Sequence, residues 1–388
     1  FVKGSGGNLG TIGPKSFPAA RLARLRKLCT LPALTDEQMV MELRGQTVDP
    51  SRPQPSVEAL VHALVPGKFV DHTHADAVLA LTDQPDGAAR VRALYGDSVL
   101  VIPYAMPGFA LARAVAEHWD ARVATGTTPT LLVLDKHGIF TWGDTAEQSY
   151  ERMIAAVTKA EEALARGRAE APRTTRSYER TPAGDGDDDH LATRARIAAA
   201  LRGELRKRDD RPWISAWRTS DVLLDLTSRP ELAALAIKGC ATPDHVIRVK
   251  PRPLVLGDLP LSDLAALRTA LAAALDDYAA DYRAYFERCT AARGGHPIPL
   301  DPWPRVVLVP GLGALTLGRS RKDADIAADI AEHTAAVILD AAALGTYEPA
   351  SELDLFDLEH WSLEQAKLGK NDDEIGRASC RERVSLNV

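Results

Sequence analysis

Three histidines have the spacing of metal ligands. His72 and His74 lie two residues apart in the strand-like segment 69–74 (FVDHTH), so both imidazoles project from one face of the strand. An isolated pair of this kind is more often solvated or hydrogen-bonded, but His137 stands in a tight turn at 136–138 and can supply a third ligand. Catalytic zinc sites take three such ligands and leave one position open. We therefore predict a zinc site built from His72, His74 and His137.

The elements around these histidines alternate between helices and strands. Apolar spacing predicts a helix at 57–64, strands at 68–72 and 98–103, and a helix at 109–118. The β-rich runs on either side of 136–138 predict a hairpin with His137 at its tip. A helix should follow, opened by Asp144 or Thr145 with Glu147 or Gln148 as capping partner.

The same order of elements recurs after a charged stretch at 166–190 that has no hydrophobic periodicity and is expected to be a linker. TPDHVIRVK resembles FVDHTHADAV, and VVLVPGLGALTLG resembles LLVLDKHGIFTWG. This alignment pairs His245 with His72 and Leu312 with His137, at nearly equal offsets along the chain. Ile247 then replaces His74. We expect a second unit that keeps the fold and lacks the metal ligands.

Composition excludes several classes of partner. The 388 residues are 45% hydrophobic and carry a net charge of −6, which argues against a nucleic-acid or anionic membrane surface as the main partner. No apolar run is long enough to span a bilayer. The four cysteines form no Cys-x-x-Cys pair, so neither a disulfide framework nor a thiolate zinc site is indicated, and a cytoplasmic location is expected.

Both ends of the chain look atypical. The sequence begins at Phe1, so we expect that an N-terminal piece is missing. The segment EIGRASCRERV near the other end resembles a translated sequencing adaptor, and we expect 371–388 to be a non-native tail.

Two longer motifs, PSVEALVHALVPGKFVDHTHADAVLAL and LVLDKHGIFTWG, resemble the class II aldolase/adducin family. The chain is most similar to the aldolase part of bifunctional rhamnulose-1-phosphate aldolase/short-chain dehydrogenase proteins, over almost everything from Phe1 to about residue 370. The resemblance implies an α/β fold of three layers (α/β/α) around a central, mostly antiparallel sheet. We expect a zinc-binding domain at 1–165 and a degenerate second unit at 191–370.

The resemblance also implies roles for individual residues. Three histidines of this kind bind zinc in the family, and the glutamate of a Pro-Ser-x-Glu motif, here Glu58, acts as the acid/base. Fuculose-phosphate aldolases carry a second serine where this chain has Val57, and their interval between the glutamate and the first histidine is longer than the one from Glu58 to His72. His62, one turn after Glu58, is expected to pack beside the site.

A glycine-rich turn at 4–7 can cradle a phosphate with successive backbone N–H groups. Ser5 and Gly6 fall where the resembling aldolases hold the substrate phosphate, and Ser56 is a second contributor. Lys3, beside the turn, is expected to be solvated.

The implied reaction is retro-aldol cleavage of a ketose 1-phosphate, most directly rhamnulose 1-phosphate, to dihydroxyacetone phosphate and lactaldehyde. A pentulose-phosphate epimerase on the same scaffold and a non-catalytic adducin-like interaction module are the alternatives. We expect a homo-oligomer that acts in rhamnose catabolism. In the resembling bifunctional proteins an NAD-dependent dehydrogenase domain follows the aldolase part. This sequence contains no G-x-G-x-x-G motif, so we expect that C-terminal domain to be missing from this fragment.

Overall fold

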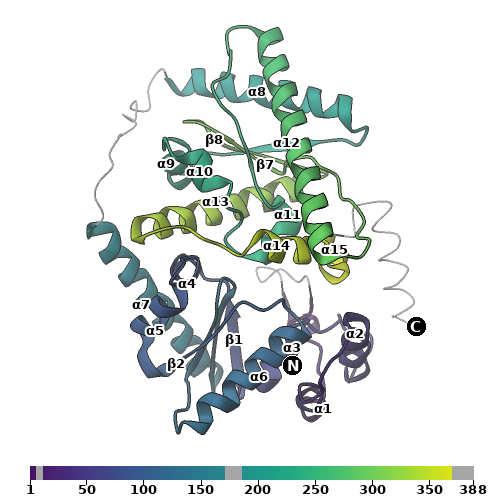
Figure 1. The fold of residues 1–388 in the computed structure, drawn as a ribbon, viewed down its shortest axis with the longest axis vertical. Coiled ribbons are helices and arrows are strands. Elements are labelled where there is room, and N and C mark those ends of the chain that lie inside the picture. Colours follow the sequence, from purple (N-terminus) through teal and green to yellow (C-terminus); the bar gives the residue numbers. More distant parts are fainter. Residues whose placement is uncertain (6–11, 171–185, 369–388) are drawn as a thin grey trace. The chain divides into compact units, whose positions relative to one another are not determined.

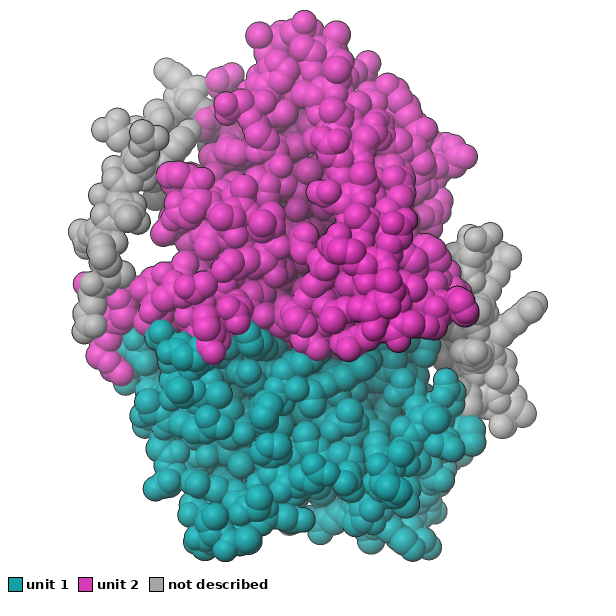
Figure 2. Space-filling model, in the orientation of Figure 1, with its two compact units in different colours: residues 1–82, 86–163, 361–388 teal, residues 83–85, 164–360 magenta. Residues whose placement is uncertain are grey.

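The structure is a computed structural model that describes residues 1–5, 12–170 and 186–368 (Figure 1). It divides into two compact units (Figure 2). The first comprises 1–82, 86–163 and 361–388, and the second comprises 83–85 and 164–360, each within the described ranges. No helix in the described part of the chain is both long and apolar enough to cross a membrane.

The first unit is built on a four-stranded sheet. Its described elements are η1 (Pro14–Ser16), α1 (Leu22–Leu28), α2 (Asp36–Gly45), α3 (Ala59–Leu64), β1 (Phe69–Thr73), α4 (Asp76–Thr82), α5 (Gly87–Tyr95), η2 (Gly96–Ser98), β2 (Val99–Ile102), α6 (Phe109–Ala124), β3 (Leu131–Leu134), β4 (Gly138–Gly143), α7 (Ala146–Glu170) and α15 (Ser362–Leu368). The strand order is β1-β4-β3-β2. β4 runs antiparallel to both of its neighbours, and β2 and β3 are parallel.

Helices cover both faces of this sheet, with α5 and α7 on one side and α3 and α6 on the other (Figure 1). The side chains of β1 explain the layering because they alternate between faces. Asp71 accepts a hydrogen bond from Ser149 of α7 at 2.6 Å, whereas His72 turns to the opposite face and stacks on Phe140. The expected three-layer α/β/α fold with a mostly antiparallel sheet is confirmed.

The local signals for α7 act as expected. Thr145 accepts a hydrogen bond from the backbone N–H of Gln148, and the Gln148 side chain accepts one from the N–H of Asp144. This reciprocal arrangement caps the first turn of the helix.

The second unit has a sheet of the same design. Its described elements are α8 (Gly186–Arg208), β5 (Ile214–Arg218), α9 (Asp221–Thr227), α10 (Leu232–Ala236), η3 (Pro243–His245), α11 (Val246–Val249), β6 (Leu254–Val255), α12 (Leu264–Arg293), β7 (Val306–Val309), β8 (Gly313–Gly318), α13 (Arg321–Leu344) and α14 (Glu352–Glu359). The order β5-β8-β7-β6 repeats that of the first sheet, with the same strand directions. The expected second copy of the fold is therefore present.

One correspondence predicted from the sequence is wrong. His245 lies in η3, just before α11, and not in a strand. Phe69, the first residue of β1, pairs with the last glycine of β4, and Ile214, the first residue of β5, pairs with the last glycine of β8. β5 is therefore the counterpart of β1. His72 and Trp217 each lie three residues after these first residues, so Trp217 is the counterpart of His72. Pro243 at the first position of η3 favours the helical turn, which the similarity of the two sequences did not indicate.

The predicted linker at 166–190 is helical at both ends, since α7 continues to Glu170 and α8 begins at Gly186. Residues 171–185 and the predicted tail at 371–388 lie outside the described residues.

Candidate metal centre

The three histidines and Glu58 form one cluster. One ligand atom from each of Glu58, His72, His74 and His137 lies within 4.8 Å of the other three. β1 supplies His72, the residue after its end supplies His74, and the turn between β3 and β4 supplies His137. Glu58 comes from the residue that precedes α3. The topology thus brings together residues that are far apart in the chain.

The spacing of these atoms suits a tetrahedral ion. Bonds of 2.0–2.1 Å to a tetrahedral zinc place neighbouring ligand atoms about 3.3 Å apart. His72 Nε2 lies 3.0 Å from His74 Nε2 and 3.5 Å from Glu58 Oε1. His137 Nε2 lies 3.2 Å from the same carboxylate oxygen. Three imidazoles and one carboxylate are a donor set that fits a divalent transition metal, so the residues present fit the implied ion.

The orientation of His72 is fixed by its other nitrogen. Its Nδ1 lies 3.0 Å from the carbonyl oxygen of Ile139, on the strand that pairs with β1. A hydrogen bond from Nδ1–H to this carbonyl leaves the lone pair on Nε2, the atom that faces the cluster. Phe140 stacks on the His72 ring with centroids 3.9 Å apart. Phe140 is not among the residues predicted from the sequence, although the pairing of β1 with β4 sets it directly opposite His72.

The turn that carries His137 depends on a glycine. A Cβ atom on Gly138 would lie 2.6 Å from the Thr73 carbonyl oxygen and 2.9 Å from a ring carbon of His74. Lys136 has a φ of 56°, so the chain turns tightly just before His137. His137 is 2% exposed. Gly138 therefore allows the turn to approach β1 closely enough for its histidine to join the other two.

The carboxylate of Glu58 is surrounded by the imidazole rings of His72, His74 and His137. Its backbone N–H donates to Ser56 Oγ at 3.3 Å, which orients the start of α3. Burial alone would raise the pKa of the Glu58 carboxyl, but His72, His137 and His74 together hold this pKa well below its usual range. The carboxylate is therefore ionised at neutral pH.

His62 lies outside the cluster, as the sequence suggested. Its ring packs edge-on against Phe140, with centroids 5.2 Å apart, and against His72, at 6.5 Å. Burial, reinforced by the nearby His72, lowers the pKa of His62 to about 4. A neutral His62 thus packs behind the cluster of His72, His74 and His137.

Two of the three predicted phosphate-binding residues are described. The backbone N–H of Ser5 donates to the Gln54 carbonyl at 3.0 Å, and the N–H of Ser56 donates to the Lys3 carbonyl at 3.2 Å. Gly6 lies outside the described residues. These bonds bring the N-terminal segment beside the segment that leads to Glu58.

Lys3 was expected to be solvated, but the structure shows it partly buried. Burial and the ammonium group of Lys367 lower the pKa of Lys3, whereas Glu58 raises it. Lys367, from α15, was not considered from the sequence because it lies near the opposite end of the chain from the motifs.

In the second unit, the positions of the three clustered histidines hold other residues. The strand registers place Trp217 at the position of His72 and Thr219 at that of His74. The predicted counterpart of His74, Ile247, is therefore wrong. Leu312 takes the place of His137, as predicted. The Trp217 indole N–H donates to the Arg194 carbonyl at 3.1 Å, and Arg194 Nε donates to the Leu312 carbonyl at 3.2 Å. Among the described residues, the only cluster with metal-ligand geometry is that in the first unit.

Comparison with known proteins agrees with this division of the chain. The sequence profile described as "Class II Aldolase and Adducin N-terminal domain" matches residues 2–164, and that described as "Aldolase class II, second domain" matches 192–368. With its fold and its cluster of histidines and glutamate, the chain belongs to the class II aldolase/adducin family.

Two individual proteins are similar to this chain. The protein named "Uncharacterized oxidoreductase YuxG" from Bacillus subtilis (strain 168) is 30% identical over 370 residues, which cover 95% of this chain and 52% of the relative. The chain thus spans about half the length of this curated relative. A solved structure, the N-terminal class II aldolase domain of a conserved protein from Thermoplasma acidophilum, is 38% identical, covers 42% of this chain and 73% of its own, and has a TM-score of 0.37.

Proposed function

We propose that the chain catalyses zinc-dependent retro-aldol cleavage of a ketose 1-phosphate to dihydroxyacetone phosphate and an aldehyde. The observation that carries this proposal is the convergence of Glu58 with His72, His74 and His137 in a member of this family. Rhamnulose 1-phosphate, which would give lactaldehyde, is the substrate that we propose from the resemblance of the motifs.

The donor set supports zinc as the resident ion. His72, His74 and His137 would hold it through neutral imidazole nitrogens, which suit zinc better than they suit magnesium or calcium. When bound, the ion supplies Lewis-acid stabilisation of negative charge on substrate oxygens.

Glu58 handles the proton in this proposal. Its carboxylate accepts the proton of the substrate hydroxyl on the carbon beyond the scissile bond. As the carbon–carbon bond breaks, that hydroxyl becomes the aldehyde carbonyl, and the electron pair of the bond passes to the three-carbon fragment. Glu58 then returns its proton to the carbon of this fragment, which becomes dihydroxyacetone phosphate. Because the pKa of the Glu58 carboxyl is low, the group is ionised at neutral pH and its oxygens can accept this proton.

The N-terminal segment is proposed to hold the substrate phosphate through Ser5, Gly6 and Ser56. Its support is the pairing of this segment with residues 54–56, immediately before Glu58. Lys3 adds a positive charge on the same side, as its interaction with Glu58 indicates.

A release assay tests the proposed reaction. The purified chain, supplied with zinc, is incubated with rhamnulose 1-phosphate, and dihydroxyacetone phosphate is measured with a coupled reductase. Stoichiometric release of triose phosphate is expected. Conversion of a pentulose 5-phosphate to its epimer, with no triose phosphate, would favour the epimerase. Absence of both products and of bound metal would favour an adducin-like interaction module.

We also propose that the full-length protein carries an NAD-dependent dehydrogenase domain after the second unit. The name and length of the Bacillus subtilis relative, an oxidoreductase about twice as long as this chain, support this proposal. Homo-oligomerisation and a cytoplasmic location stay predictions.

A further inference from the structure

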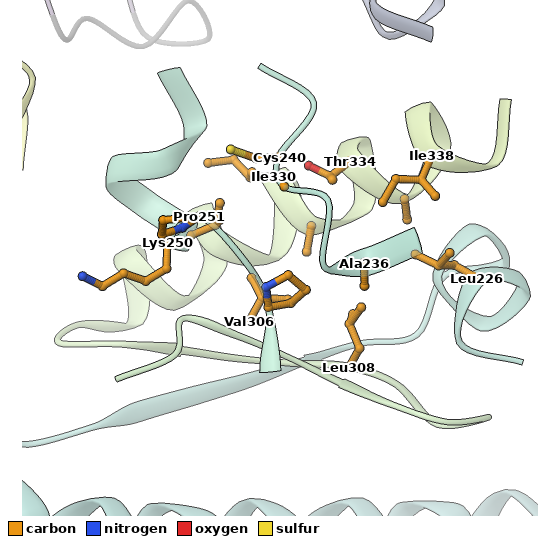
Figure 3. Close-up of a pocket in the computed structure, with 15 residues that line it drawn as sticks. Leu226, Ala236, Cys240, Lys250, Pro251, Val306, Leu308, Ile330, Thr334 and Ile338 are labelled. Carbon is orange, nitrogen blue, oxygen red and sulfur yellow. The ribbon is translucent and has the colours of Figure 1, made fainter. Parts of the chain in front are cut away.

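The second unit contains a cavity between its sheet and α13 that is partly open to solvent (Figure 3). Its walls are mainly hydrocarbon, with Val306 and Leu308 of β7 on the sheet side. Lys250 also lines it, but its amine points away from the other labelled side chains and donates to Glu359 at 3.2 Å. The cavity therefore favours an uncharged ligand.

The repeat identifies which residue of the first unit corresponds to one wall of this cavity. β2 and β6 take the same place in their sheets, and their registers align Leu100 with Leu254. Tyr95 lies five residues before Leu100, and Val249 lies five residues before Leu254, so the same alignment pairs Tyr95 with Val249. Tyr95 is the last residue of α5, and Val249 is the last residue of α11.

The backbone after these two residues supports the alignment. Gly96 has a φ of 63° and Lys250 a φ of 69°, both in the left-handed region. Each donates its N–H to the carbonyl four residues earlier, on Arg92 and Val246 respectively. The two helices thus end in the same way, and Val249 replaces Tyr95.

The long helices align equally well. The buried Thr141 and Thr316, at matching positions of β4 and β8, each donate to the carbonyl oxygen eight residues later, at the start of α7 or α13. Counting forward along the chain from these two threonines aligns Ala156 of α7 with Ala331 of α13.

In the first unit, a tyrosine ring occupies the space beside this helix. The Tyr95 hydroxyl donates to the Ala156 carbonyl at 2.7 Å, and the ring is 7% exposed. Lys159 Nζ lies 5.7 Å from the ring centroid.

The counterparts of all three residues line the cavity of the second unit. They are Val249 for Tyr95, Ala331 for Ala156 and Thr334 for Lys159. The Thr334 hydroxyl is buried and has no hydrogen-bond partner among the residues that the structure describes. The cavity is thus lined at the positions that, in the first unit, carry the Tyr95 ring and its two neighbours on α7.

We propose that the cavity of the second unit binds a small molecule with an uncharged phenol ring. The ring lies between β7 and α13, and its hydroxyl donates to the Ala331 carbonyl as Tyr95 donates to Ala156. Thr334 Oγ1 offers the ligand a second hydrogen bond. This site is separate from the metal centre and does not depend on the proposed aldol reaction.

Phenol itself is the probe. Calorimetric titration of the whole chain is expected to give one binding site, and toluene, which lacks the hydroxyl, should bind at least fivefold more weakly. Val249→Tyr restores the residue of the first unit and should weaken phenol binding more than tenfold. Tyr95→Val is the matched change in the first unit and should create a second phenol site.

A second variant is needed in case Val249→Tyr does not fold. Ala331→Leu fills the same cavity from α13 and should also abolish phenol binding, while the zinc content of the chain stays unchanged. If wild-type chain fails to bind phenol at millimolar concentration, or if folded Val249→Tyr or Ala331→Leu binds it as well as wild type, the assignment is overturned. Equal binding of toluene and phenol would overturn the role of the hydroxyl.

Discussion

Glu58 lies almost as close to the imidazole nitrogens as two of them lie to each other: its Oε1 is 3.2 Å from His137 Nε2, and the His72 and His74 Nε2 atoms are 3.0 Å apart. An oxygen in this place can serve either as a fourth ligand or as the group that exchanges a proton with the substrate. The two roles differ in what happens when the oxygen is replaced by a group that does not titrate.

We predict that Glu58→Gln retains metal and lowers turnover by about 10²–10⁴-fold, the contribution typical of general acid–base catalysis. His74→Ala should instead lose the metal. Metal analysis and triose-phosphate release on the same preparations give both numbers. Loss of metal in Glu58→Gln to the extent seen in His74→Ala would make Glu58 a ligand, and full activity would remove it from the mechanism.

Gly138 is predicted to be essential for metal binding. In Gly138→Ala, the new Cβ would meet the Thr73 carbonyl and the His74 ring, so β1 and the turn must separate and metal content should fall. Gly313→Ala is the matched control, because its Cβ would lie 2.5 Å from the Arg218 carbonyl at the same point of the second sheet. Both changes should lower the melting temperature. Equal metal content in the two variants would contradict the role given to Gly138.

At the scale of elements, much of the first unit is predictable because its signals are local. The alternation in 69–74 defines β1, and the run of apolar β-formers before 136–138 defines the hairpin that presents His137. The stack of Phe140 on His72 and the approach of Glu58 depend on register and helix placement. These are tertiary features, which local patterns do not encode.

The error at His245 has a physical cause. Between its first and second strands the second unit has α10 and η3 in addition to α9 and α11, which correspond to α4 and α5 of the first unit, so a constant offset does not hold across this region. The offset taken from the similar segments therefore matched His72 with a residue just before α11, whereas the strand pairing requires a shorter offset, which aligns His72 with Trp217. Sequence similarity identified the repeat, and only strand pairing could identify the correct partners.

The end of α11 is predicted to depend on an ion pair. Lys250 and Glu359 are both almost fully buried, and Lys250 also donates to Tyr282 at 3.0 Å. Lys250→Met should lower the free energy of unfolding by about 3–5 kcal/mol, because it leaves a buried carboxylate without its cation. Lys207→Met is the control: this lysine pairs with Glu204 at 2.7 Å but is 65% exposed, so its loss should cost less than about 1 kcal/mol. Chemical denaturation measures both, and equal effects would argue against a structural role for the buried pair.

At the scale of the whole chain, the same fold occurs twice, and the two copies differ in the side chains at equivalent positions. The first unit places histidines where the second has Trp217, Thr219 and Leu312, and the second has a cavity where the first has Tyr95. The fold signals that survive in both, such as the glycines at the ends of β4 and β8, are those that the sheet and the following helix require sterically.

This division predicts that metal removal acts on one unit only. A ligand that binds the folded state stabilises the region that binds it. Treatment with a chelator should therefore raise amide hydrogen exchange in β1, β4 and the turn between β3 and β4. Exchange in β5 and β8 should stay the same. Increased exchange in β5 and β8 of similar size would contradict metal binding confined to the first unit.

The metal centre is tested by the metal content of the purified chain after dialysis, measured by elemental mass spectrometry for wild type and for His74→Ala in parallel. We expect one zinc per wild-type chain and almost none in His74→Ala, because three imidazoles are needed to hold the ion. A folded wild-type chain that takes up no divalent transition metal, or a His74→Ala variant that keeps the full amount, would contradict the metal centre formed by His72, His74 and His137.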